Sequence, residues 1–143
     1  MEKQSYATHA KTVPMFRTLA GILLLTFFGS LYNLYQSLGD HSRLYNASLI
    51  TVLSFAMLVL LYYCRTFPLK AQDRAIRAEE NLRHFVLTGK PLDPRLTIKQ
   101  IIGLRFASDD EFAELARKAA SEGLSQDAIK RAVNNWRADH DRL

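Results

Sequence analysis

Two long apolar runs separated by a short polar turn dominate the first half of the chain. They cover Met15–Leu38 and Leu44–Tyr63, and the turn between them is Gly39–Arg43. Apart from Arg17, neither run contains Lys, Arg, Asp or Glu. Because a helix rises about 1.5 Å per residue, each run is long enough to cross a hydrocarbon core of about 30 Å. The pattern predicts an all-α chain that begins with a two-helix transmembrane hairpin.

A stripe of small and polar side chains gives each run one face suited to protein contact. Lipid offers no hydrogen-bond partner to an amide such as that of Asn33, so this face should turn inward. We expect the packing face of the hairpin to be formed by Thr26, Ser30, Asn33, Thr51 and Ser54. Neither run carries a charged group at membrane depth, which favours an anchor over a transport pathway.

The charges that flank the runs predict the orientation of the hairpin. The turn carries only Arg43, offset by Asp40, whereas basic residues precede the first run and follow the second. The positive-inside bias then places both termini in the cytoplasm. Residues 65–105 hold nine basic and four acidic side chains. We expect four of these basic residues to contact anionic lipid headgroups, namely Arg65, Lys70, Arg74 and Arg77.

An amphipathic helix is predicted at 66–90, with Thr66 as its cap and Pro68 in its first turn. Gly89 suits the left-handed position that ends such a helix. Its apolar residues recur at spacings of four and three, which form a seam suited to a partner helix: Ala71, Ala75, Ala78, Leu82 and Phe85. The seam has three possible partners, which are the chain's own distal helices, a second copy of the chain, or the membrane surface.

Three short helices are predicted in the last third. Thr97 with Gln100 and Ser108 with Glu111 match the capping-box pattern, and Ser125 is placed to cap a third helix. Gly123 should end the second helix. The predicted apolar faces are Ile98, Ile101, Ile102 and Phe106; then Phe112, Leu115, Ala116 and Ala119; then Ile129, Ala132, Val133 and Trp136.

These elements divide the chain into four parts. The predicted order is a tail (1–14), the hairpin (15–65, with spans at about 15–38 and 44–64), a juxtamembrane amphipathic helix (66–90) and a small cytoplasmic three-helix module (91–143).

A search for chemistry-bearing patterns identifies no catalytic, cofactor-binding or metal-binding residues. Cys64 is the only cysteine, so an intrachain disulfide is excluded, and the predicted state is an unmodified thiol at the membrane interface. The four histidines lack metal-ligand spacing, and we interpret Asp139–Asp141 as a solvated chain segment. Asp109–Glu111 is better explained by helix capping than by a set of catalytic carboxylates.

Nucleic-acid binding is the main alternative reading of the last third. Ala119, Gly123, Leu124 and Ile129 have the spacing of a helix-turn-helix. The reading helix would then present Lys130, Arg131, Asn134, Asn135 and Arg137. However, residues 108–143 carry six basic and eight acidic side chains, whereas DNA binders need a basic footprint, so we expect no nucleic-acid partner.

Four stretches of sequence point to a known family. They are Gln72–Phe85, Asp93–Thr97, Gln100–Asp109 and Asn135–His140. Together they resemble a family of short bacterial membrane proteins known only as a domain of unknown function. The resemblance implies a bacterial inner-membrane protein with two spans, and it implies no activity and no catalytic residue.

The sequence therefore predicts a non-enzymatic, multi-pass membrane protein without cofactors. Its expected partners are inner-leaflet lipids and either an unidentified protein or another copy of the chain. The alternatives are a membrane-tethered DNA-binding regulator and an accessory subunit of a membrane enzyme or transporter.

Overall fold

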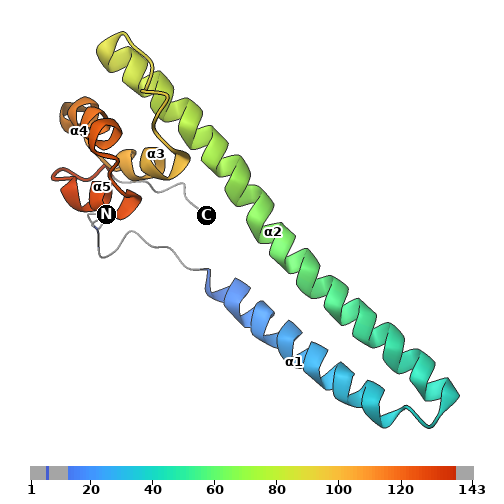
Figure 1. The fold of residues 1–143 in the computed structure, drawn as a ribbon. Helices are drawn as coiled ribbons and strands as arrows, with labels where there is room; N and C mark the ends of the chain where they lie inside the picture. Colours follow the sequence, from blue (N-terminus) through green and yellow to red (C-terminus); the bar gives the residue numbers. More distant parts are fainter. Residues whose placement is uncertain (1–5, 7–12, 138–143) are drawn as a thin grey trace. The chain divides into compact units, whose positions relative to one another are not determined.

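A computed structural model describes residue 6 and residues 13–137 of the chain. These residues form the helices α1 (Pro14–Gln36), α2 (His41–Thr88), α3 (Ile98–Leu104), α4 (Asp109–Glu122) and α5 (Gln126–Ala132) (Figure 1). Over the described ranges, β-type pairing is limited to one isolated bridge between Ala107 and Trp136. The predicted all-helical class is confirmed for these residues. Most of the predicted tail, 1–14, lies outside them.

The chain divides into two compact units within α2. The apolar unit is Thr12–Pro68, and the C-terminal unit is Leu69–Leu143 together with Met1–Lys11. Helix α1 and the first part of α2 belong to the apolar unit. The second part of α2 and the three short helices belong to the C-terminal unit.

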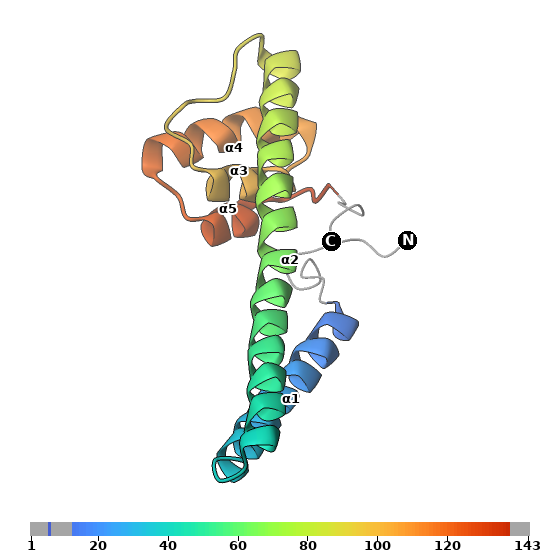
Figure 2. The same cartoon turned by 90° about the vertical axis from the view of Figure 1, so that its right-hand side faces the viewer.

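Within the apolar unit, α1 and the first part of α2 run in opposite directions (Figure 2), and side chains of the two helices meet at Ser30 and Ser54, at Phe27 and Phe55, and at Phe16 and Arg65. The hydroxyl oxygens of Ser30 and Ser54 lie 3.2 Å apart, and the Thr51 hydroxyl donates to the Ser30 carbonyl at 3.2 Å. The less exposed residues recur at spacings of three and four, which is the geometry of a coiled-coil seam. They are Phe16, Ala20, Leu23, Phe27, Ser30 and Leu34 on α1, its C-cap Ser37, and Leu44, Ala47, Thr51, Ser54, Leu58, Leu61 and Arg65 on α2, beside which Ser48 and Thr66 are also partly buried.

The structure therefore brings together three of the five residues predicted to form the packing face. Ser30, Thr51 and Ser54 are buried in the contact. Thr26 and Asn33 are exposed, and the Thr26 hydroxyl donates to the Ile22 carbonyl of its own helix at 2.9 Å. Both residues lie one position away from the seam, because large residues such as Phe27 and Leu34 occupy it instead.

Helix α2 passes through Pro68 without a break, which corrects the prediction of a separate helix starting at Thr66. The Thr66 hydroxyl donates to the Tyr62 carbonyl at 3.0 Å, so Thr66 is an interior residue and not a cap. Proline removes one backbone hydrogen bond, but a helix can continue through it when the segments before and after the proline are each held by tertiary packing. The helix ends at Thr88, and Gly89 has the predicted left-handed conformation (φ +72°).

The C-terminal unit has its own hydrophobic core, formed by the second part of α2 and the three short helices that lie beside it (Figure 1). Helix α3 lies against α5 at Gly103, where an added Cβ would come 3.1 Å from the Gln126 carbonyl oxygen. The Thr97–Gln100 capping box and the Ser125 cap are formed as predicted, and Gly123 ends α4 with a φ of +62°. The core contains Ile76, Leu92, Leu96, Ile101, Leu104, Ala107, Phe112, Leu115, Ala116, Ala119, Ile129 and Val133.

The apolar faces predicted for the first and third short helices include residues that lie beyond the ends of α3 and α5. Phe106 follows the end of α3, while Val133 and Trp136 follow the end of α5. The chain after α5 is extended and pairs with the α3–α4 turn, where Arg137 N–H donates to the Phe106 carbonyl at 2.8 Å. The Trp136 ring packs on Phe106 with 5.0 Å between centroids, whereas Ala132 is exposed. The apolar pattern correctly indicated burial at Val133 but not the conformation.

Candidate interaction surfaces of the C-terminal unit

One face of α2 is buried against the short helices. Ile76 and Glu80 are each 6% exposed on this face, and the Arg83 side chain is 11% exposed. A buried carboxylate and a buried guanidinium need each other, because either one alone carries a large desolvation cost. Glu80 and Arg83 meet this need with a 3.0 Å contact one helical turn apart.

Arg83 joins α2 to the start of α4. Its Nε donates to Asp109 Oδ1 at 2.7 Å, and its Nη2 donates to the Ala107 carbonyl at 2.8 Å. The guanidinium also lies over the Phe112 ring, 4.3 Å from its centroid. The sequence explained Asp109 only as part of the start of a helix, and the structure gives it this second role.

The predicted seam lies on the opposite side of α2. A helical residue turns about 100° from its neighbour, which places the seam well away from Ile76 and Glu80. Leu82 is 63% exposed and Phe85 is 52% exposed. Ala71, Ala75 and Ala78 are also exposed, so the module's own helices do not cover the seam.

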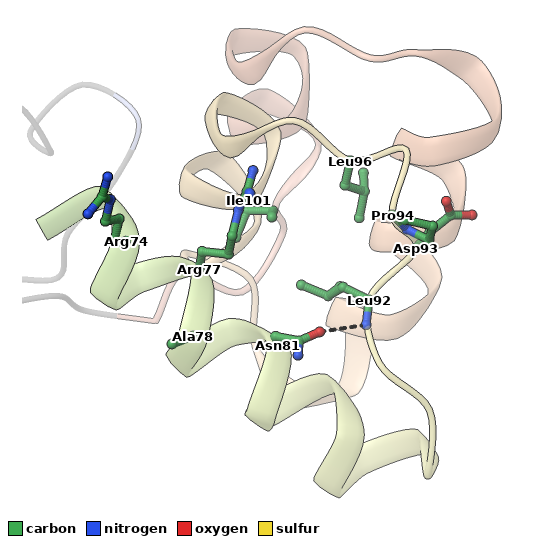
Figure 3. Close-up of a pocket in the computed structure, with 9 residues that line it drawn as sticks. All are labelled: Arg74, Arg77, Ala78, Asn81, Leu92, Asp93, Pro94, Leu96 and Ile101. Atoms are coloured by element: carbon green, nitrogen blue, oxygen red, sulfur yellow. Dashed lines mark hydrogen bonds between the residues drawn. The ribbon is translucent and has the colours of Figure 1, made fainter. Parts of the chain in front are cut away.

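A basic groove runs along the flank of α2 beside this seam (Figure 3). Its main cavity, of about 500 Å³, is formed between α2, the 91–97 connector and α3. Asn81 holds the connector in place by accepting a 2.9 Å hydrogen bond from Leu92 N–H. Arg74 and Arg77 line this cavity and also a neighbouring one of about 280 Å³ that includes Lys70 and Asp73. Three of the four predicted headgroup-contacting residues thus lie together, while Arg65 belongs to the apolar unit, where it lies 5.8 Å from the Phe16 ring centroid.

Most polar side chains that could suggest catalysis have structural contacts. His84 Nδ1 lies 2.7 Å from the Lys90 carbonyl, where it closes the end of α2. Glu111 accepts hydrogen bonds from the backbone N–H groups of Asn134 and Asn135, at 3.1 and 3.0 Å, and from that of Ser108 at 3.4 Å. Among the residues that the structure describes, no three His, Cys, Asp or Glu side chains cluster as metal ligands. Asp139–Asp141 lies outside those residues.

The contacts of Glu111 affect its ionisation. Burial raises the pKa of the Glu111 carboxyl, but the N–H groups of Asn135, Asn134 and Ser108 outweigh burial and hold the pKa below its ordinary value of 4.5. The carboxylate therefore stabilises the return of the chain after α5 as well as the start of α4.

The helix-turn-helix pattern does not produce the reading helix that it suggests. Helix α5 ends at Ala132, so Asn134, Asn135 and Arg137 lie in the extended segment after it. Lys130 is 9% exposed and lies 5.6 Å from the Phe106 ring centroid. Only Arg131 of the five is an exposed helical residue, and it contacts Asp127 at 2.9 Å.

Sequence reasoning missed the residues that join the helices to one another. Gln100 was predicted only as a cap, yet its amide nitrogen also donates to the carbonyls of Ala119 and Leu124, at 3.2 and 3.0 Å. Glu80 and Arg83 were not singled out as residues that join helices. Their three-residue spacing was visible in the sequence, but their burial depends on contacts with α4.

The fold and these surfaces define an all-helical protein with two helices long and apolar enough to cross a membrane. The chain belongs to a family of unknown function, DUF6526, whose model matches residues 1–143. This match confirms the family-level resemblance. No curated protein and no solved structure matches the chain.

Proposed function

We propose that the protein is a non-enzymatic membrane anchor that presents its C-terminal helices to a protein partner or to another copy of itself. In this proposal α1 and the first part of α2 form a transmembrane hairpin. The observation that carries the proposal is the reversed polarity of the apolar unit, whose buried side chains include hydroxyls while its large apolar side chains are exposed.

The exposed side chains argue against a water-soluble location for this unit. Leu25 is 76% exposed, Val52 is 66% exposed and Phe28 is 63% exposed. Of the 18 consecutive residues that make up the most apolar part of α1, only 6% are buried, and the corresponding share in α2 is 11%. Core helices of soluble proteins bury most of such a surface, whereas helices in lipid turn it outward and place small and hydroxyl-bearing residues between them.

The flanking charges support an orientation with both termini in the cytoplasm. From the family resemblance, we propose the bacterial inner membrane as the location. Lys70 and Arg77 follow closely after the second span in the sequence and lie farther from the seam than Arg74, so their side of the groove is available to anionic headgroups. Each basic residue near such a surface contributes about 1 kcal/mol to the attraction.

The polar contacts of the C-terminal unit support a binding role over catalysis. Arg83, Asp109 and Glu111 hold the helices together, and His84 closes the end of α2. The groove and the seam remain as exposed features of α2 in this unit.

A topology experiment tests the anchor. A reporter active only in the cytoplasm should be active when fused after Leu143 and inactive when inserted at Gly39. Alkaline carbonate washing should leave the protein in the membrane fraction. Extraction by carbonate, or activity at Gly39, would contradict the proposal.

A crosslinking experiment tests the binding role. Crosslinking in native membranes followed by mass spectrometry should recover a protein partner or a second copy on residues 69–137. A matched sample with Leu82→Ala and Phe85→Ala, which truncate the exposed seam without touching the buried face, separates seam-dependent products from the others. Recovery of a strictly monomeric chain would argue against the binding role.

A further inference from the structure

We infer that the seam on α2 pairs with the same seam of a second copy, in a parallel and in-register arrangement. This inference rests on the proposed function and specifies its partner. It joins three observations: the seam is exposed, charged residues lie on its two sides, and the seam begins shortly after the second apolar run in the sequence.

The exposed seam follows the repeat of a two-stranded coiled coil. Ala75 and Leu82 take the positions conventionally labelled a, and Ala71, Ala78 and Phe85 take those labelled d. Small residues come first along α2 and larger ones later, so two such helices can approach closely at one end and interlock side chains at the other. Leu82 and Phe85 are more than half exposed, so pairing would remove a substantial apolar surface from water.

The charges beside the seam select the parallel orientation. Arg74 precedes an a position and Glu79 follows a d position, on opposite sides of the seam. In a parallel pair, these two sites face each other across the interface, so Arg74 of one copy meets Glu79 of the other, twice by symmetry. Both side chains are exposed and belong to no ion pair within the described part of the chain. In an antiparallel pair, like sides would face each other and this match would be lost.

The chain's connectivity favours the same orientation. Tyr63 ends the second apolar run, and Ala71, the first residue of the seam, follows it by eight residues in every copy. If both copies enter one bilayer in the same direction, the Ala71 ends of both seams lie near the membrane. A short seam pairs weakly between freely diffusing helices, but confinement to one bilayer raises the effective concentration of the second copy.

A lipid surface is a less suitable occupant of the seam. Helices that lie on anionic membranes place basic residues along the edges of their apolar face. Here one edge carries Arg74, while the other carries Gln72 and Glu79. The acidic edge is repelled by anionic headgroups, whereas it has a partner in a second copy.

Disulfide crosslinking tests the register. In a Cys64→Ser background, Ala78→Cys places one thiol in each seam, and parallel in-register pairing brings the two thiols within disulfide distance. Mild oxidation of membranes that contain this variant should give a crosslinked dimer. Arg77→Cys, the neighbouring residue on the flank of the same helix, should give about tenfold less. Equal crosslinking of the two variants, or none at Ala78→Cys, would overturn the inference.

Charge exchange tests the ion pairs and the orientation. In the Ala78→Cys background, Arg74→Glu and Glu79→Arg should each reduce crosslinking several-fold, because like charges then face each other. Mixing differently tagged Arg74→Glu and Glu79→Arg copies should restore it as a mixed dimer, because every facing pair is again of opposite charge. Crosslinking that stays at the level of the parent in both single variants would exclude the parallel arrangement, because an antiparallel pair already places like charges opposite each other in the parent.

The same membranes separate the two proposals. If carbonate retains the protein and the Leu143 reporter is active, but Ala78→Cys does not crosslink, only the pairing fails. If the thiol of Ala78→Cys is then shielded from a water-soluble maleimide in vesicles rich in anionic lipid but is labelled in neutral vesicles, the seam binds lipid and the inference is wrong. If carbonate extracts the protein, the anchor itself fails.

Discussion

At the scale of single residues, Arg83 provides the main polar connection between α2 and the start of α4. We expect Arg83→Ala to lower the free energy of unfolding of the C-terminal unit by about 3–5 kcal/mol, because Glu80 stays buried without its partner. Chemical unfolding in detergent micelles, followed by the fluorescence of Trp136, measures this change, since Trp136 is the only tryptophan.

Two controls show whether burial is the reason. Asp93 and Arg95 form a 2.7 Å ion pair in which the Arg95 side chain is 69% exposed, so Arg95→Ala should leave the unfolding midpoint nearly unchanged. The double variant Glu80→Gln/Arg83→Met should recover part of the loss, because it removes both buried charges. A loss equal for Arg83→Ala and Arg95→Ala would show that the contact with Glu80 and Asp109 is not stabilising.

Glu111 predicts a dependence of stability on pH. Its carboxyl has a lower pKa in the folded protein than its ordinary value of 4.5, so it stabilises the fold above that value. This contribution is lost as the pH falls from about 4.5 through the folded pKa. Glu111→Gln should therefore be less stable than the parent at pH 7, by about 1–3 kcal/mol, and the two should converge at low pH. Urea titrations at a series of pH values check this, and a gap that stays constant with pH would contradict it.

The close approach of α3 and α5 at Gly103 leaves little room for a side chain at this position. In Gly103→Ala the new Cβ would lie 3.1 Å from the Gln126 carbonyl and 3.2 Å from the Ile129 side chain. The carbonyl belongs to the first residue of α5 and cannot move alone, so we expect a loss of about 1–3 kcal/mol and a larger loss for Gly103→Val. Gly21→Ala is the matched control, because nothing lies within 4 Å of its added Cβ. Its unfolding midpoint should not fall.

At the scale of the helices, the sequence predicted where helices begin and end more accurately than it predicted which helices contact one another. Thr97, Ser125, Gly89 and Gly123 end or begin helices as predicted, since capping depends on residues within one turn. The same local view missed the second hydrogen bonds of Gln100 and Glu111, because these depend on helices that are distant in the sequence. It also made α5 too long, because the extended chain after Ala132 is held by Phe106 and Glu111.

The seam shows the limit of periodicity. Spacing alone identified an apolar stripe on residues 71–85 and a packing role, but it could not choose among three partners. The structure removes one of them, because the module's helices pack on Ile76, Glu80 and Arg83 instead. In the sequence, that face has one large apolar residue, Ile76, among charged residues, and such a pattern is typical of a solvent-exposed face. Only the structure shows that Glu80 and Arg83 are buried together.

Pro68 predicts a local weakness in α2. As a proline inside a helix, it leaves the carbonyl one turn earlier without its usual N–H partner. Pro68→Ala should supply that donor and slow hydrogen exchange of the amides at 66–72, with α2 unchanged elsewhere. Pro14→Ala is the matched control, since Pro14 lies in the first turn of α1, where its missing N–H has no cost. Unchanged exchange in Pro68→Ala would show that the helix around Pro68 is already as stable as the rest.

At the scale of the whole molecule, the two compact units have opposite organisation. The C-terminal unit buries apolar residues and exposes charges, as a water-soluble domain does, whereas the apolar unit buries Ser30, Thr51 and Ser54 and exposes leucines and phenylalanines. The average hydropathy of the chain is near zero and conceals this contrast. With the proposed membrane location, each unit would owe its stability to a different solvent, and the two units should respond separately to changes in either solvent.

Separate unfolding of the units follows from this organisation. Phe112 is fully buried in the core of the C-terminal unit, so Phe112→Ala should lower the stability of that unit by about 3–5 kcal/mol. In micelles, the Trp136 transition should shift to lower denaturant, while a helical signal from residues 14–68 persists beyond it. Ser30→Leu, which places a bulky side chain between α1 and α2, should do the reverse and leave the Trp136 transition in place. A single transition that moves equally in both variants, by fluorescence and by circular dichroism, would show that the chain unfolds as one cooperative body.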